Sequence, residues 1–219
     1  MSSEALIFDD PSTVHDLRNL INRAKSIDAE AAQLMARGAA LAVYVPVLAP
    51  TNLGSGEFTI LGMRVHRLAE PAQLTACYSV ASIQDRLARM ADTSREFTLP
   101  PVPEFPSWTG IQVPVSGWEP LSRISDAVLA EAARAGITAV ADALPANPGK
   151  PVIAQVRQRI WSSPQPDTEP ALALGAAFAM ETLGFLAPQG QSTVFRNGSW
   201  LRVTSSRGHV LLRQDAALF

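Results

Sequence analysis

Histidine and cysteine side chains are the first candidates for metal binding or nucleophilic catalysis in this chain. The three histidines, His15, His66 and His209, lie far apart in the sequence and form no HExxH or HxH pattern. The single cysteine, Cys77, lies in an expected strand and has no basic neighbour that would lower the pKa of its thiol. The sequence therefore predicts no metal site, no cofactor and no catalytic motif, and we expect Cys77 to be a buried structural thiol.

Two glycine-containing segments share single features with phosphate-binding loops. Residues 147–151 end in Gly-Lys-Pro, but they lack the first glycine and the following serine or threonine of a P-loop. Residues 54–56 lie between two expected strands and do not open a helix. We interpret both as turns. An enzyme is therefore not the favoured hypothesis, although a site built from distant residues has no such sequence signature.

Two aromatic surfaces remain as candidate binding sites. The extended, proline-rich segment 97–119 carries two tryptophans, which could line a ligand cleft or an interface, or anchor the segment to the core. One face of the C-terminal strands is aromatic and basic, and it could bind an anion or a nucleic-acid backbone. The alternative is an ordinary solvated or helix-covered face. The tentative binding residues are Trp108, Trp118, Trp200, Arg202, His209 and Arg213.

The C-terminal strands form the best-defined element of the sequence, a three-stranded antiparallel meander over residues 191–214. Asn197-Gly198 is typical of a two-residue hairpin turn, and Arg207-Gly208 could form a second. With two-residue loops, Val194 lies opposite Leu201, and Val203 lies opposite Leu212. One face is then apolar and is expected to be buried, and it consists of Val194, Leu201, Val203, Val210 and Leu212.

Capping residues and helical spacing predict the other elements. We expect helices at 11–23, 28–37, 82–90, 120–135, 151–161 and 171–186, where the second ends at Gly38 and the third begins at Ser82. Strands are expected at 41–48, 58–68 and near 76–80, with a loop at 50–56, and a short strand could lie at 111–115. The helix at 171–186 is apolar nearly all round, so we expect it to be central.

These elements predict an α+β fold with N-terminal helices and a small antiparallel sheet, followed by a three-helix segment that the meander closes. We expect an N-terminal half at 1–96, the extended crossing at 97–119 and a C-terminal half at 120–219. The sequence leaves open whether the crossing links two domains or straps one together.

Composition limits the classes of function. The 219-residue chain has a formal net charge of −2, which does not favour nucleic acid as a partner. It has no signal-peptide pattern and no membrane span, and we expect a cytoplasmic location. The favoured hypothesis is a non-catalytic interaction module whose partner is itself, as a homo-oligomer, or another protein. A ligand-binding enzyme at the proline-rich crossing is one alternative.

A DNA-binding regulator is the other alternative. Three helices followed by a β-hairpin resemble the element order of winged-helix proteins, in which a recognition helix precedes the hairpin. The expected helix at 171–186 contains no Arg, Lys, Asn or Gln to reach base edges or phosphates. This weakens the DNA-binding hypothesis.

Overall fold

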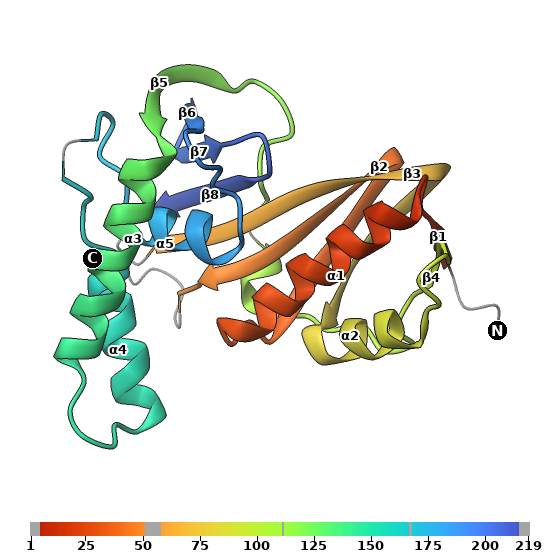
Figure 1. The fold of residues 1–219 in the computed structure, drawn as a ribbon, viewed down its shortest axis with the longest axis horizontal. Coiled ribbons are helices and arrows are strands. Elements are labelled where there is room, and N and C mark those ends of the chain that lie inside the picture. Colours follow the sequence, from red (N-terminus) through yellow and green to blue (C-terminus); the bar gives the residue numbers. More distant parts are fainter. Residues whose placement is uncertain (1–4, 51–57, 111, 167, 215–219) are drawn as a thin grey trace. The chain divides into compact units, whose positions relative to one another are not determined.

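The computed structural model describes residues 5–50, 58–110, 112–166 and 168–214, and within them the fold is α+β, as predicted. A small sheet pairs β1 with β4, and a larger sheet has the strand order β2-β3-β8-β7-β6-β5 (Figure 1). In chain order the elements are β1 (Ala5–Ile7), α1 (Pro11–Ser26), β2 (Ala31–Leu48), β3 (Phe58–Ser79), α2 (Val80–Arg89), β4 (Glu96–Thr98), the 3-10 helix η1 (Ser107–Gly110), β5 (Glu119–Ser125), α3 (Asp126–Ala143), α4 (Lys150–Trp161), α5 (Leu174–Thr182), β6 (Gln191–Asn197), β7 (Trp200–Thr204) and β8 (His209–Gln214).

The chain divides into two compact units. Unit 1 takes in residues up to 46 and residues 63–112, and unit 2 takes in residues 47–62 and residues from 113 onward. Strands β2 and β3 therefore contribute residues to both units. The predicted segments 1–96, 97–119 and 120–219 stay a prediction.

Helix α1 of unit 1 forms where the sequence predicts it. Asp10 has an extended backbone and its carboxylate accepts a hydrogen bond from the backbone N–H of Ser12 at 2.7 Å, while Pro11 occupies the first helical position. The helix contacts β3 through Asp16, and its axis runs along β2 (Figure 1). Its buried face carries Val14, Leu17, Leu20, Ile21 and Ala24, which repeat at helical spacing.

The predicted helix at 28–37 is wrong, because most of this segment belongs to β2. Alternate residues Ala32, Leu34 and Ala36 are fully buried, which is the two-residue period of a strand. Gly38, predicted as a helix C-terminal residue, has a positive φ of 62° inside the strand. Pairing with distant β3 thus overrides the local helix propensity of an alanine-rich segment.

The other N-terminal predictions hold with shifted limits. The expected strands at 41–48, 58–68 and near 76–80 are parts of β2 and β3, and the loop at 50–56 lies outside the described residues except for Pro50. Helix α2 begins at Val80, two residues earlier than predicted, because Ser79 is the cap residue and its hydroxyl accepts from the Ser82 N–H. The crossing contains the last two residues of β4 and the whole of η1, and residues 112–118 form no strand.

In unit 2 the predicted helix at 120–135 begins too early. Residues 119–125 form β5, an edge strand paired with β6, and the helix starts at Asp126 after the cap residue Ser125. Residues 120–125, taken alone, fit the amphipathic pattern of either a helix or a strand. Pairing with β6, far along the chain, decides between them.

The three helices of unit 2 pack around an aromatic pair. Helix α4 matches its prediction, and α5 is shorter than predicted but is buried over most of its length. The rings of Trp161 and Phe178 stack with centroids 4.3 Å apart. Gly136 of α3 lies against Trp161 so closely that a Cβ there would come within 2.3 Å of the ring. A side chain at this position has no space.

The meander forms as predicted, but its register differs by two residues. Val194 lies opposite Val203, and Val203 lies opposite Val210. The loops are Gly198-Ser199 and residues 205–208, because Asn197 and Thr204 are paired strand residues. A shift of two keeps every side chain on its predicted face. Val194, Val203, Val210 and Leu212 are buried and Leu201 is half-buried, while Trp200 and Leu211 of the opposite face are also buried.

Candidate interaction surface

The aromatic and basic face of the meander is organised around Arg202. Its guanidinium lies over the Trp118 ring and over the Phe195 ring, 4.5 Å from each centroid. Such cation–π contacts are worth about 0.5–2 kcal/mol each. Burial lowers the pKa of Arg202, and its buried Nε has no hydrogen-bond partner among the described residues. The arginine that we predicted as an anion ligand thus holds two aromatic rings together.

Residues 114–118, which precede β5, are held against this face by hydrogen bonds. The indole N–H of Trp118 donates to the backbone oxygen of Pro114 at 3.0 Å, and the Asn197 amide donates to the backbone oxygen of Ser116 at 2.6 Å. Asn197 is the last paired residue of β6, and its side chain anchors the segment. We call Trp118, Phe195 and Arg202, together with this segment, the strap.

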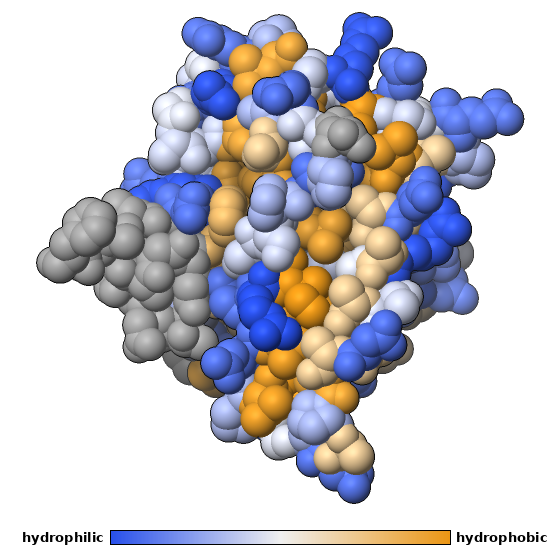
Figure 2. Space-filling view, turned by 90° about the vertical axis from the view of Figure 1, so that its left-hand side faces the viewer, coloured by the Kyte–Doolittle hydropathy of each residue, from blue (hydrophilic) through white to orange (hydrophobic). Residues whose placement is uncertain are grey.

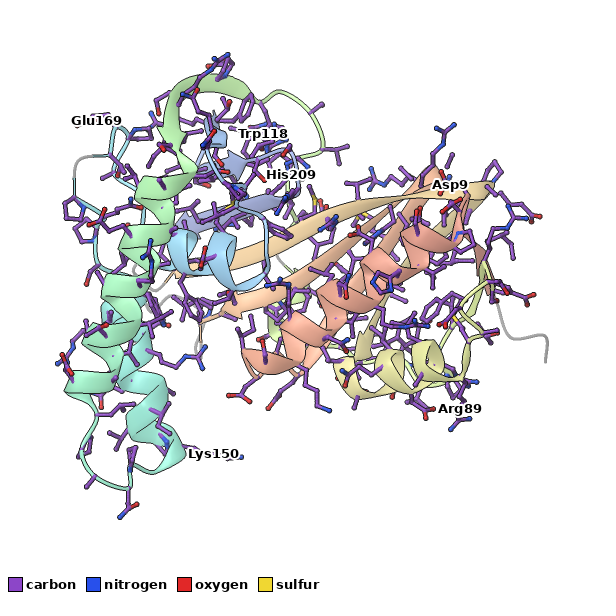
Figure 3. All side chains as sticks on the ribbon, viewed as in Figure 1. Asp9, Arg89, Trp118, Lys150, Glu169 and His209 are labelled. Carbon is purple, nitrogen blue, oxygen red and sulfur yellow. The ribbon has the colours of Figure 1, made fainter. Side chains whose placement is uncertain are left out.

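The remaining predicted residues have different environments. His209 lies within hydrogen-bond distance of the Thr204 hydroxyl (3.0 Å from Nδ1), and burial, with a smaller contribution from the charge of Arg202, lowers its pKa to about 4. Trp200 is buried, and Arg213 is half-buried on the same face. Figure 3 labels Trp118 and His209 in unit 2. Trp108 belongs to unit 1, where it lies in η1 and is buried. Partner binding by these six residues stays a prediction.

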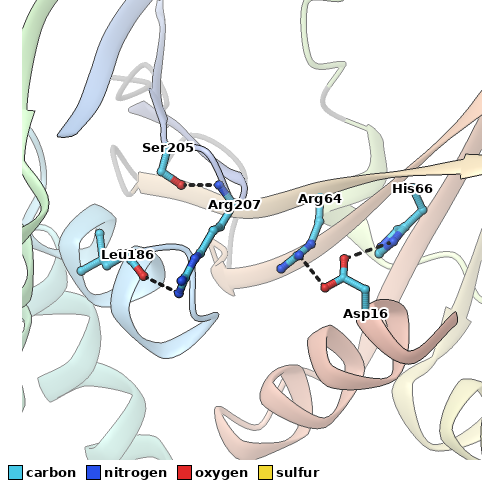
Figure 4. A network of polar contacts seen from close by, with 6 residues as sticks. All are labelled: Asp16, Arg64, His66, Leu186, Ser205 and Arg207. Atoms are coloured by element: carbon cyan, nitrogen blue, oxygen red, sulfur yellow. Dashed lines mark hydrogen bonds and ion pairs between the residues drawn. The ribbon is translucent and has the colours of Figure 1, made fainter. Parts of the chain in front are cut away.

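Unit 1 holds a polar cluster that the sequence analysis missed. Asp16 of α1 pairs with Arg64 of β3 and lies 3.6 Å from Nδ1 of the buried His66 (Figure 4). Burial, followed by the charge of Arg64, lowers the pKa of His66 to about 4. His66 is therefore neutral at pH 7, and the ion pair of the cluster is Arg64–Asp16. No local spacing signals this cluster, because α1 and β3 are far apart in the sequence.

The two histidines of low pKa predict a pH-dependent stability. An unfolded histidine has a pKa of about 6.5, so the unfolded chain binds more protons than the native chain between about pH 6.5 and pH 4. The free energy of unfolding is therefore expected to fall as the pH is lowered through this range. The slope for each histidine corresponds to the uptake of at most one proton on unfolding.

Urea unfolding at a series of pH values measures this dependence. In the variants His66→Gln and His209→Gln, the loss of stability between pH 6.5 and pH 4.5 should be smaller than in the original chain. His15→Gln is the matched control, because His15 is exposed on α1. A variant of a buried histidine whose pH dependence equals that of the original chain would contradict the prediction.

Unit 2 also contains a hollow of about 260 Å³ at the turn between β6 and β7. Its apolar lining includes Phe58, Leu201 and Leu212, and Arg196 and Arg213 supply charge. A segment with apolar and acidic side chains matches this lining.

In unit 1, Cys77 is buried as predicted, and burial, followed by the nearby Glu104, raises the pKa of its thiol to about 11.

The described residues contain no cluster that could bind a metal ion and no helix that could cross a membrane. No group of three or more His, Cys, Asp or Glu side chains lies in position to hold a metal ion there. Within the same ranges, every helix is too short or too polar to span a membrane.

Family models divide the chain inside the crossing segment, where the assignment to units also changes. Residues 1–110 match a family described as "Domain of unknown function (DUF8010)". This chain belongs to the DUF8010 family. Residues 113–217 of the DUF8010 chain match a second family model, "Domain of unknown function (DUF8185)". No curated protein matches the sequence.

Solved structures similar to the DUF8010 chain include subunits of bacterial DNA polymerases. A proposed DNA polymerase III beta subunit from Eubacterium rectale has a TM-score of 0.55 at 9% identity. The DNA polymerase III sliding clamp of Bartonella birtlesii, bound to griselimycin, has a TM-score of 0.53 at 8% identity. The DNA polymerase beta subunit of Streptococcus pyogenes has a TM-score of 0.53 at 10% identity.

These likenesses extend over almost all of the DUF8010 chain. They cover 98–99% of it and 65–66% of the three structures, so the chain spans slightly less than two thirds of their length. At such low identity they show the fold, which is that of sliding clamps. The expectation that nucleic acid is not a partner finds no support in this fold, because the similar structures are DNA polymerase subunits.

Proposed function

We propose that this chain is a non-catalytic protein-interaction module of the sliding-clamp fold that acts in the cytoplasm and associates with copies of itself. The observation that carries the proposal is the likeness to sliding clamps over 98–99% of the chain. A fold alone does not define a function, so self-association needs its own test.

Light scattering coupled to size exclusion tests self-association. We expect a mass of at least twice the 23.4 kDa of one chain, with dissociation on dilution if the contact is weak. A mass of 23.4 kDa over about a hundredfold range of concentration would overturn the proposal.

Contact with a DNA backbone is the second candidate function, and the helices of unit 1 favour it. Together, α1 and α2 contain five Arg or Lys and two Asp, a net charge of +3, in a chain whose formal net charge is −2. Neither helix has an acidic residue in its first turn, and both have basic residues in the last turn. The Gln84 amide donates to the Asn22 side chain at 2.8 Å and so joins the two helices. Surface charge of this kind binds phosphates without reading base sequence.

An electrophoretic mobility shift with duplex DNA tests this candidate. We expect a shift at low ionic strength that weakens with salt, and the variant Lys25→Glu/Arg86→Glu should lower the salt slope by about two phosphate contacts. Arg134→Glu/Arg159→Glu is the control for net charge, since both residues are exposed on helices of unit 2. No shift at low salt would end the candidate.

A further inference from the structure

The tip of the hairpin formed by α3 and α4 presents apolar side chains to solvent. We define the hairpin tip as residues 137–155, and none of these 19 residues is buried. Ile137 is 43% exposed and Val152 is 39% exposed. Ten of the 19 residues are Ala, Val, Ile or Leu, and two are charged. A helix surface in water is normally covered by charged and polar residues, so this composition needs an explanation.

Core packing in this hairpin ends where the tip begins. The last buried residue of α3 is Gly136, and the first buried residue of α4 is Val156. The residues between them are half-buried or exposed. Figure 2 shows a stripe of apolar side chains with hydrophilic side chains on both sides. The apolar residues of the tip therefore lie outside the buried core of unit 2.

The two charges of the tip have opposite signs and lie on different helices. Asp142 is near the end of α3, and Lys150 is the first residue of α4, where its side chain extends outward (Figure 3). Both are exposed, and neither forms a salt bridge within the part of the chain that the structure describes. Two opposite charges on one surface can pair with the same surface of a second copy. A two-fold axis that places Asp142 of one copy against Lys150 of the other also forms the reciprocal pair.

We infer that the hairpin tip is the contact surface between two copies of this chain. In this arrangement the exposed faces around Ile137 and Val152 pack together, and Asp142 of each copy faces Lys150 of the other. The inference rests on the proposed self-association and adds the surface that carries it. Apolar side chains with few charges are typical of the centre of homodimer interfaces.

Substitution of the apolar residues is the first part of the test. In light scattering of the full chain, Ile137→Glu and Val152→Glu should weaken association at least about tenfold. Val65→Glu is the matched control, because Val65 is 49% exposed but belongs to unit 1, and it should leave association unchanged. Circular dichroism of each variant is the control for folding, and it should show that the helix content is unchanged.

A charge swap is the second part, and it identifies the occupant. Asp142→Lys and Lys150→Asp should each weaken association, because like charges then face one another, and the double variant should restore it. A double variant no better than the single ones overturns the pairing of two copies through the tip.

The outcomes separate this inference from the proposed function. If the original chain is oligomeric and the Glu variants stay equally oligomeric, the hairpin tip is not the contact and self-association stands. If the original chain is monomeric at every concentration, both fall.

Discussion

Asp126→Ala is expected to destabilise the protein by about 3 kcal/mol, which lowers the melting temperature by roughly 10 °C. Asp126 is 2% exposed at the first position of α3. Its carboxylate accepts a hydrogen bond from the Ser192 hydroxyl at 2.6 Å and another from the backbone N–H of Ala187 at 2.9 Å. Removal of the carboxylate leaves both donors without an acceptor, and the hydroxyl is in a buried environment.

Two further variants separate the hydrogen bonds of Asp126 from a general effect of charge. Ser192→Ala removes one donor and leaves the other bond intact, so its cost should be about 1 kcal/mol. Glu131→Ala removes an exposed acid from the same helix and should change stability by less than about 0.5 kcal/mol. If Asp126→Ala costs no more than Glu131→Ala in urea unfolding, Asp126 does not connect α3 to the meander as described.

Gly136→Ala should also destabilise the protein, by about 1–2 kcal/mol, although alanine favours helices. The gain in helix propensity is about 1 kcal/mol. Against it, the new Cβ would lie 2.3 Å from the Trp161 ring and 3.0 Å from Leu174. Trp161 cannot withdraw freely, because its ring stacks on Phe178 at 4.3 Å. Overpacking of a tight core costs about 1–3 kcal/mol, occasionally more, and here it exceeds the gain.

A double-mutant cycle tests the cause. Trp161→Leu frees space beside position 136, so the double variant should be more stable than the sum of the two single effects predicts. Gly149→Ala is the control, because a Cβ there would meet only Pro151 at 3.7 Å, an ordinary contact. A neutral or stabilising Gly136→Ala would show that the space beside Trp161 is larger than in the structure.

Elements with local signals were predictable from the sequence. Helix α1 has Asp10 and Pro11 at its start, and the meander has Gly198 at its first turn. Residues 28–37 were misassigned because their composition favours a helix while β3, far along the chain, recruits them into a sheet. Local propensity amounts to a few tenths of a kcal/mol for most residues, so sheet pairing and burial decide.

The candidate surface was predictable in its face but not in its partners. Strand parity placed Arg202 and Phe195 together, since a register error of two residues leaves parity unchanged. Trp118 comes from the segment before β5, and no spacing in the sequence brings it to Arg202. The exposure of Ile137 and Val152 was equally hidden, because an amphipathic pattern does not show where packing against the core ends.

The route of the chain through β2 and β3 has a consequence for how the protein can be divided. The two family models meet near residue 112, yet unit 2 also includes residues 47–62, and β3 is the neighbour of β8 in the larger sheet. A fragment that starts at residue 113 would leave β8 with an unpaired edge, a site of aggregation. The boundary between the family models therefore does not coincide with the limits of unit 2, and only a fragment that retains β3 preserves its pairing with β8.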